Sequence, residues 1–430
     1  MIGNLGRNRL LINQGDGSFR EQPMDSVWEK GMFTTSLAMG DVSGDHLPDI
    51  VEVNYLDDPK IFEPLKRKPD GTPVGFPGPL HFRPAIDRIF ESRGNGQATG
   101  STLAASNEKN TAATGLGVLL TNLNSSVGNE IFVANDLMPN DYFQQHSANK
   151  GWSEDAASRG LAVGANGNPL ACMGIAAADV DGNGHTDLFI TNFEDQWANL
   201  YVQSADGFFR DLVVAFGLSS PTYKMLGFGA QALDFDNNGT IELVAGNGHI
   251  EDFSADGKQF KMPTQLFVQK GSRYQEIGVK GDDNYWNAGH LSRALATCDY
   301  NNDGRIDIAV TDLIEPFALL QNQTKCKVNR WLQLQLVGSA CERDAVGSKV
   351  TVVTSKQRHV AVVQSGDGYL GKNQSIMLFG FGPSETTDSI SSIEVQWADG
   401  QSDHFENVGY ENRWLLVQGA DSAFALLNSE

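Results

Sequence analysis

Short apolar runs of branched and aromatic residues recur along the chain, and each follows a polar stretch rich in Asp, Asn and Gly. Four of these runs are residues 50–53, 188–191, 243–245 and 308–311. Branched residues bounded by turn-forming residues predict buried strands. Further along, an Asn, Asp or Gln precedes an apolar pair, and a turn and often an aromatic residue follow. This second pattern predicts two more strands after each run.

Together these patterns form a repeating unit of strand, acidic loop, strand, turn, strand, Gly-rich turn and strand. The unit is roughly 55–65 residues long, and four short strands at such a period are typical of one β-propeller blade. We therefore predict an all-β chain with a propeller of six blades, the first incomplete, and seven blades remain compatible with the pattern. Because the first copy begins at its third strand, we expect an N-terminal truncation.

The pattern changes after residue 325, where the acidic loops stop. Apolar and polar residues alternate at 331–337 and 393–397, and a period of two predicts strands with one buried face. We predict a propeller over residues 1–324 and a small antiparallel β-domain, such as a sandwich, over residues 325–430. A proline-rich insertion near residues 57–84 interrupts the repeat.

The acidic stretches share one sequence pattern, with oxygen-bearing side chains at positions 1, 3, 5 and 9 of a nine-residue loop. Ca²⁺ takes about six to eight oxygen ligands, several of them charged, and the backbone carbonyl at position 7 adds another. Glycine at position 6 of three loops permits a sharp turn. We predict four calcium sites with these residues at positions 1, 3, 5, 7 and 9: Asp41, Ser43, Asp45, Leu47 and Asp49; Asp179, Asp181, Asn183, His185 and Asp187; Asp234, Asp236, Asn238, Thr240 and Glu242; Asp299, Asn301, Asp303, Arg305 and Asp307.

These loops differ from EF-hands, whose twelve-residue loop ends in a bidentate Glu between two helices. Only the first loop has an acid at its twelfth position, Glu52. The alternative is a set of solvated acidic turns that bind nothing, but such turns need only one or two Asx residues. A fifth, degenerate copy at Asn122–Glu130 keeps the oxygens with a single charge, and we expect it to be weak or empty.

The formal net charge is −21, and twelve of the 53 acidic residues lie in the four loops. This excess argues against nucleic acid as a partner, and no apolar run is long enough to cross a bilayer. Calcium loops of this kind favour an extracellular, periplasmic or cell-surface location. The first residues are not a signal peptide, as expected of a mature or truncated chain. Four cysteines are too few for a disulfide scaffold, although Cys326 and Cys341 are close enough in sequence to pair.

Two parts of the sequence resemble known families. The motifs Arg343-Asp344, Gly366-Asp-Gly-Tyr369 and Phe379-Gly-Phe-Gly382 are similar to those of the ASPIC/UnbV domain, and the repeats resemble FG-GAP/VCBS propeller blades. Together they resemble the bacterial relatives of cartilage acidic protein. Asn122-Leu-Asn124 departs from the repeat pattern, which favours Asp there. The resemblance implies an exported, calcium-binding protein associated with a matrix or a surface.

No nucleophile, zinc-protease or phosphate-loop motif is present in the sequence. We predict a non-enzymatic protein in which structural calcium supports adhesion or binding of an extracellular protein or glycan. One alternative is a carbohydrate-binding module, for which Trp152, Trp197 and Trp286 are candidate stacking residues. The other is an enzyme with its site in the propeller channel, for which His249, Asp136 and Glu251 are candidates.

Overall fold

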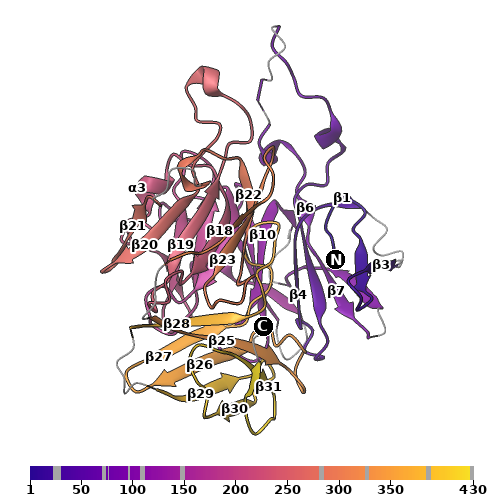
Figure 1. The fold of residues 1–430 in the computed structure, drawn as a ribbon. Coiled ribbons are helices and arrows are strands. Elements are labelled where there is room, and N and C mark those ends of the chain that lie inside the picture. Colours follow the sequence, from indigo (N-terminus) through magenta and orange to yellow (C-terminus); the bar gives the residue numbers. More distant parts are fainter. Residues whose placement is uncertain are drawn as a thin grey trace.

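The protein is all-β, with a propeller and a two-sheet C-terminal domain packed against one end of it (Figure 1). The structure is a computed structural model that describes residues 1–22, 31–69, 74–75, 77–94, 97–106, 112–145, 151–279, 285–324, 329–383 and 389–426. Its helices are single turns: η1 (Pro59–Phe62), η2 (Pro79–His81), α2 (Ala156–Arg159), α3 (Ser219–Thr222), η3 (Ser254–Asp256) and η4 (Tyr285–Asn287). Among the described helices, none has the length and apolar character of a membrane span.

Three consecutive blades are regular four-stranded antiparallel sheets. Their strands are β10 (Gly115–Thr121), β11 (Glu130–Asn135), β12 (Asp141–Gln145) and β13 (Trp152–Glu154); β14 (Cys172–Ala178), β15 (Asp187–Asn192), β16 (Asn199–Gln203) and β17 (Phe209–Asp211); β18 (Gly227–Leu233), β19 (Glu242–Asn247), β20 (Gln265–Lys270) and β21 (Arg273–Ile277). The first strands of neighbouring blades, β10, β14 and β18, pack against one another. They are therefore the inner strands of the propeller.

The blades on either side of these three are less regular. One contains β4 (Met32–Gly40), β5 (Asp49–Asn54), β7 (Arg88–Ser92) and β8 (Ala98–Thr102), with β1 (Leu5–Gly6) paired to β4. The other has three strands, β22 (Ser292–Cys298), β23 (Asp307–Asp312) and β24 (Ala318–Leu320). A separate hairpin of β2 (Leu10–Asn13) and β3 (Phe19–Gln22) precedes them. Counted as an incomplete first blade, this hairpin gives the six blades that the sequence predicts.

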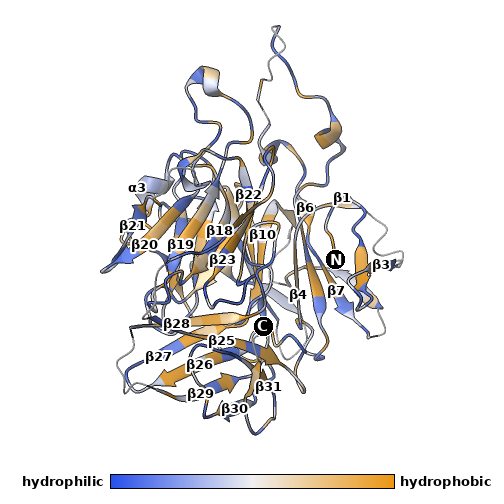
Figure 2. Cartoon of the chain, viewed as in Figure 1, coloured by the Kyte–Doolittle hydropathy of each residue, from blue (hydrophilic) through white to orange (hydrophobic). Residues whose placement is uncertain are grey.

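The apolar runs that follow the acidic loops become the second strands of the blades. Every residue of β11, β15 and β19 is buried, because neighbouring blades cover both faces of each sheet. Phe189 of β15 and Phe267 of β20, for example, lie with their ring centroids 6.5 Å apart between two blades. Figure 2 shows hydrophobic residues along the strands of the blades and of the C-terminal sheets.

The described part of the 57–84 insertion rises above the propeller, on the side away from the C-terminal domain (Figure 1). It contains η1 and η2, and a bridge between Leu56 and Pro84 closes its base. The short strands β6 (Ala85–Ile86) and β9 (Ala112–Ala113) pair beside it.

The C-terminal domain is a sandwich of two four-stranded sheets. They contain β28 (Met377–Pro383), β25 (Asn329–Val337), β31 (Arg413–Val417) and β32 (Phe424–Leu426), and β27 (Arg358–Val362), β26 (Lys349–Thr354), β29 (Ile390–Gln396) and β30 (Ser402–Phe405). The predicted antiparallel arrangement holds except for β25 and β31, which pair in parallel. Between these two strands the chain crosses to the second sheet and back twice, by way of β28.

Three of the four cysteines can be described, and Cys172, Cys298 and Cys341 carry free thiols. Cys326, the residue that we considered as a partner for Cys341, lies outside the described residues.

The loop between β27 and β28, residues 363–376, enters the propeller and is called the inserted segment below. Ser365 exchanges two backbone hydrogen bonds with Leu120 of β10, at 2.8 and 2.9 Å. Gly368 does the same with Ile175 of β14, at 2.9 and 2.6 Å. The inserted segment thus pairs with two inner strands as a short edge strand would.

The same segment also contacts the other three inner strands. The Ser365 hydroxyl accepts the amide of Met39 in β4 at 3.0 Å. Asn373 donates to Gln231 of β18 at 2.7 Å and accepts the amide of Thr297 in β22 at 2.7 Å. One loop of the C-terminal domain therefore touches the first strand of each of the five blades that have three or more strands, and it occupies the centre of the propeller.

We predict that Gly366→Ala lowers the free energy of unfolding by about 2 kcal/mol or more. Gly366 has a φ of 82°, and a Cβ there would lie 2.7 Å from the Cβ of Ala38 and 2.8 Å from the carbonyl oxygen of Val118. Denaturant unfolding measures the loss. Gly371→Ala is the matched control in the same segment, because its Cβ would meet nothing closer than 3.7 Å. Equal stability of the two variants would show that the inserted segment is not tightly held.

Candidate metal centres

Each acidic loop connects the first and second strands of one blade, at the end of the propeller that faces the C-terminal domain. Lys349 of β26 donates to the carbonyl oxygen of Gly184 in the second loop at 3.2 Å. Gln333 of β25 donates to Oδ2 of Asp299 in the fourth loop at 2.6 Å. The loops are therefore part of the interface between the two domains.

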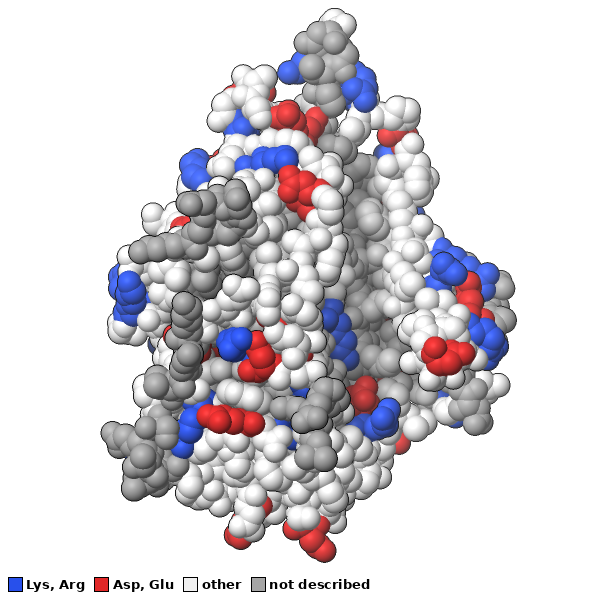
Figure 3. All heavy atoms as spheres, viewed as in Figure 1, with Lys and Arg blue, Asp and Glu red and all other residues white. Residues whose placement is uncertain are grey.

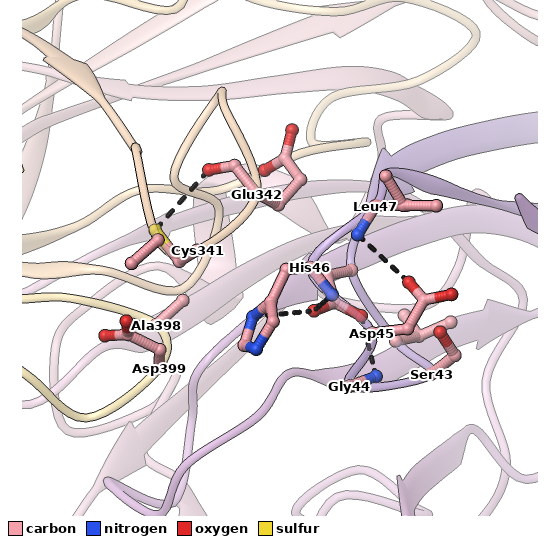
Figure 4. A network of polar contacts seen from close by, with 12 residues as sticks. Ser43, Gly44, Asp45, His46, Leu47, Cys341, Glu342, Ala398 and Asp399 are labelled. Atoms are coloured by element: carbon pink, nitrogen blue, oxygen red, sulfur yellow. Dashed lines mark hydrogen bonds and ion pairs between the residues drawn. The ribbon is translucent and has the colours of Figure 1, made fainter. Parts of the chain in front are cut away.

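The first loop approaches the same domain from the side (Figure 4). The view shows residues 43–47 facing the turns that carry Cys341 and Glu342, and Ala398 and Asp399. Asn129, at position 8 of the degenerate loop, donates to the carbonyl oxygens of both Asp41 and Val346, at 2.9 and 3.1 Å.

The carboxylate at position 1 of each loop caps the turn. Asp179 accepts the amides of Asn183 and Gly184 at 3.0 and 2.8 Å, and Asp234 and Asp299 accept the corresponding amides in their loops. In the first loop Asp41 accepts from Gly44 and His46 instead. There His46 stands at the position that glycine takes elsewhere, with a φ of 70°.

The carboxylate at position 9 fastens the loop to the blade. Asp187 is fully buried, accepts the Val180 amide at 2.9 Å through Oδ2, and accepts the Gln203 amide at 2.8 Å through Oδ1. Asp49 and Asp307 make the equivalent pairs of contacts. Position 9 therefore joins the start of the loop to the end of the third strand, a structural role beyond the predicted ligand role.

The backbone conformation at position 4 of the loops was not predicted from the sequence. All five loops have a positive φ there, at Gly44, Ser125, Gly182, Asn237 and Asn302. Gly and Asn adopt this conformation most readily. The residue type at position 4 was thus a usable signal of the turn, beside the glycine at position 6.

The structure gathers the carboxylates of two loops into compact groups. Asp179, Asp181 and Asp187 can each place one oxygen within 4.8 Å of the others, and Asp234, Asp236 and Glu242 form the same arrangement. Oxygen ligands at this spacing are what a hard divalent cation requires. These two groups fit the predicted calcium sites in donor type and number of charges.

The other two predicted sites do not form such a group among the described residues. In the fourth loop the guanidinium of Arg305 pairs with Asp303, and Gln333 donates to Asp299. In the first loop Nδ1 of His46 lies 3.9 Å from Oδ2 of Asp41. The sequence predicted four equivalent sites, whereas the structure distinguishes two gathered loops from two that are not.

The remaining predicted ligands are used within the loops. The position 5 side chains of Asp45, Asn183, Asn238 and Asp303 each accept the amide of position 7, at 3.0, 2.8, 2.7 and 3.0 Å. Those amides belong to Leu47, His185, Thr240 and Arg305. Ser43 is buried, and Asn301 donates to Asp303 at 2.9 Å.

The degenerate loop shows how the turn is held where charge is missing. The side-chain amide of Asn122 donates to the carbonyl oxygens of Ser126 and Gly128. Glu130 accepts the amides of Leu123 and Asn124 at 2.7 and 3.2 Å. The NH₂ group of Asn122 thus contacts the position 7 carbonyl of Gly128, which the sequence pattern assigns to a cation. We still expect this site to be weak or empty.

Burial makes the gathered carboxylates hard to ionise without a cation. Desolvation raises the pKa of Asp187 and of Asp234 from 3.8 to about 7, and that of Glu242 from 4.5 to about 8. Neighbouring carboxylates contribute to these raised pKa values, as Asp181 does for Asp187. A bound divalent cation would offset both effects.

A cleft of about 700 Å³ lies between the propeller and the C-terminal domain. Asp179 and Asp234 line its propeller side, and Arg358, His359 and Arg343 line its other side. Figure 3 shows that acidic and basic side chains are interspersed on the face in view, without a single large acidic patch. Part of the acidic excess is thus placed at the domain interface.

Two of the three candidate catalytic residues are in contact, and the third has a separate partner. Nε2 of His249 lies 3.2 Å from Glu194, and its Nδ1 accepts the backbone amide of Glu251 at 3.1 Å. Asp136 instead accepts the hydroxyl of Tyr55 at 2.6 Å. Among the described residues no hydrogen bond or ion pair joins His249 to Asp136. Trp152, Trp197 and Trp286 each pack against a different core cluster, so they do not form one stacking platform.

Sequence comparison finds a family match within each part of the chain. Residues 338–423 match the family described as ASPIC and UnbV, and residues 179–245 match the FG-GAP-like repeat. The second match spans both gathered loops. The chain is thus a propeller with FG-GAP-like repeats followed by an ASPIC/UnbV domain.

Curated relatives are named cartilage acidic protein 1. The Xenopus tropicalis protein is 26% identical over 323 residues, which are 74% of this chain and 46% of the relative. The Mus musculus protein is 28% identical over 295 residues, 67% of this chain and 42% of the relative. The chain therefore spans less than half the length of the curated relatives it matches.

Solved structures give weaker likenesses. An Agrocybe aegerita lectin that recognises non-reducing terminal N-acetylglucosamine has a TM-score of 0.36 and 13% identity, covering 75% of this chain and 89% of that one. The Dos1 propeller has a TM-score of 0.29 and 12% identity, covering 84% and 83%.

We predict that the calcium-free protein loses stability as pH rises through the interval between the unfolded and folded pKa values of the gathered carboxylates. A carboxyl with a raised folded pKa binds its proton more tightly in the folded state. Its contribution is therefore complete below the unfolded value and is lost as pH passes the folded value. For Glu242 these values are 4.5 and about 8.

Denaturant unfolding in EDTA across this range measures the effect. The side chain introduced by Glu242→Gln does not titrate. Between low and high pH, the free energy of unfolding of this variant should therefore fall by at least about 1 kcal/mol less than that of the wild type. A wild-type protein and a variant with parallel pH profiles would contradict the raised pKa.

Proposed function

We propose that the chain is a calcium-dependent binding protein of the extracellular type, in which calcium ions in the acidic loops fix the C-terminal domain against the propeller. The observation that carries this is the placement of two gathered carboxylate groups at the domain interface. Ions there would neutralise buried negative charge and stiffen the surface on which the domain rests. Calcium is proposed over magnesium because the loops offer many oxygens in an irregular arrangement, which suits its larger and more flexible coordination shell.

The contacts between loops and domain explain how ion binding would reach the C-terminal domain. Gly380 of β28 lies so close to the third loop that a Cβ there would overlap Oδ2 of Asp234. The backbone amide of Gly382 donates to the carbonyl oxygen of Asn237 at 2.8 Å. A calcium ion that holds Asp234 in place also holds the surface that receives β28.

We place the contact with an extracellular protein or glycan at the 700 Å³ cleft. Its volume falls in the range of roughly 300–1,000 Å³ that small-ligand sites occupy, often between domains. This favours a short glycan or peptide segment over a flat protein surface. With calcium bound beside Asp179 and Asp234, and with Arg343 and Arg358 opposite, the cleft would favour a ligand with carboxylate or hydroxyl groups.

The location and the absence of enzymatic activity follow as parts of the same proposal. FG-GAP-like repeats and ASPIC/UnbV domains are typical of extracellular proteins, and the relatives carry a name that refers to cartilage. The described contacts of His249 and Asp136 favour structural roles for both side chains.

We predict that calcium, and not magnesium, raises the melting temperature by several degrees. Binding to the folded state alone contributes about 2.7 kcal/mol per site at a hundred-fold excess over Kd. The double variant Asp181→Asn/Asp236→Asn should lose most of this rise. Asp181 is exposed and Asp236 half-buried, so the substitutions remove one negative charge from each site while sparing the buried contacts of positions 1 and 9.

Two comparisons complete the experiment. Asp45→Asn/Asp303→Asn changes the loops that are not gathered and should lose less of the calcium effect. Asp256→Asn, an exposed acid outside the loops, should lose none. A wild-type protein that does not respond to calcium would leave the loops as ordinary acidic turns.

A further inference from the structure

One histidine and two carboxylates converge at the opposite end of the last blade from its acidic loop. His290 precedes β22, while Asp312 ends β23 and Glu315 follows it. Each offers a ligand atom within 4.8 Å of the others. Because β22 and β23 are six to seven residues long, about 20 Å separates this group from the acidic loop at the other end.

The hydrogen bonds of His290 leave one ring nitrogen aimed at a negative group. Nε2 lies 2.8 Å from the carbonyl oxygen of Tyr285, so it must carry the hydrogen and donate. In the neutral ring Nδ1 then holds a lone pair, yet it lies 2.9 Å from Oε2 of Glu315. Two acceptors at this distance repel each other unless a cation or a proton lies between them.

The imidazole is also fixed in place from outside the group. It is buried, and the Tyr285 ring stacks on it with a centroid distance of 3.8 Å and an interplanar angle of 7°. The backbone of His290 exchanges two hydrogen bonds with Met262, at 2.9 and 2.8 Å. A carbonyl that holds the far nitrogen of a histidine is the usual support of a metal-ligating ring.

Both carboxylates are oriented by contacts that leave lone pairs available. Asp312 accepts the Leu291 amide at 2.6 Å through Oδ2, and the amides of Ile314 and Glu315 through Oδ1. Lys261 holds Oε1 of Glu315 at 2.5 Å and leaves Oε2 facing His290. The Glu315 side chain is one-third exposed, so an ion can reach the group from solvent.

We propose that His290, Asp312 and Glu315 bind a divalent first-row transition metal, of the zinc or cobalt type. An imidazole nitrogen with two carboxylates suits such ions, whereas Ca²⁺ prefers a shell of oxygens. Three protein ligands leave at least one coordination position for water or for a ligand group. This site is independent of the acidic loops and of the function proposed for them.

The sequence did not single out this group because its members follow no spaced motif. His290 and Asp312 are brought together only by the pairing of β22 with β23, in which Ser292 and Asp312 are partners.

The test is a titration of the chelator-treated full chain with Co²⁺, in excess calcium that occupies the acidic loops. The d–d absorption of cobalt reports an ordered ligand set that includes nitrogen. Glu315→Gln removes one anionic ligand near the surface and should leave the fold intact. Glu394→Gln is the matched control, because Glu394 is similarly exposed and forms an ion pair with Arg358.

The wild type and Glu394→Gln should bind one equivalent of Co²⁺ with a saturable spectrum that Zn²⁺ displaces. Glu315→Gln should bind at least about tenfold more weakly. No saturable spectrum in the wild type would overturn the proposal and would leave an imidazolium paired with Glu315. Unchanged binding in Glu315→Gln would overturn it as well, because cobalt would then be held elsewhere.

Discussion

The contact on which the rest of the structure depends is the insertion of residues 363–376 between the inner strands of the blades. A propeller blade buries its faces against its neighbours, but its first strand has a free inner edge. Ser365 and Gly368 pair with that edge on β10 and β14, and Asn373 reaches β18 and β22. Gly366 and Gly368, both with positive φ, let the segment turn in this narrow space.

This insertion determines where the C-terminal domain lies, and hence what surrounds the acidic loops. With the segment in place, β25, β26 and β28 lie over the loops, and Gln333, Lys349 and Gly382 bond to them. Asp187, Asp234 and Glu242 are then buried close to other carboxylates, and burial raises their pKa values to about 7, about 7 and about 8. The degenerate loop escapes this repulsion because Glu130 is its single carboxylate. Docking of the C-terminal domain and the proposed cation binding would therefore depend on the same buried charges.

Much of the fold could be predicted from the sequence, because it rests on local patterns. The apolar runs after each acidic loop became β15, β19 and β23, and the Asn199-Leu-Tyr pattern became β16. The parallel pairing of β25 and β31, and the path of residues 363–376, depend on contacts between distant segments that no local pattern encodes. The Gly366-Asp-Gly-Tyr369 motif was visible, but its place among the inner strands was not.

The same division applies to the candidate sites. The nine-residue sequence pattern located all four loops. It could not show which loops bring their carboxylates close together and which do not. In the fourth loop, Arg305 lies beside Asp303 and Gln333 of the other domain lies beside Asp299. The His290 group was missed for a related reason, because strand pairing rather than spacing brings it together.

Hydrogen–deuterium exchange of residues 363–376, with calcium and with EDTA, tests the central claim most directly. The amides of Ser365 and Gly368 are bonded to Leu120 and Ile175, so their exchange reports whether the segment is seated in the propeller. If calcium in the loops secures the C-terminal domain, calcium should slow exchange in this segment as well as in residues 179–187 and 234–242. Slower exchange in the loops alone, with no change in the segment, would show that ion binding and domain docking are separate.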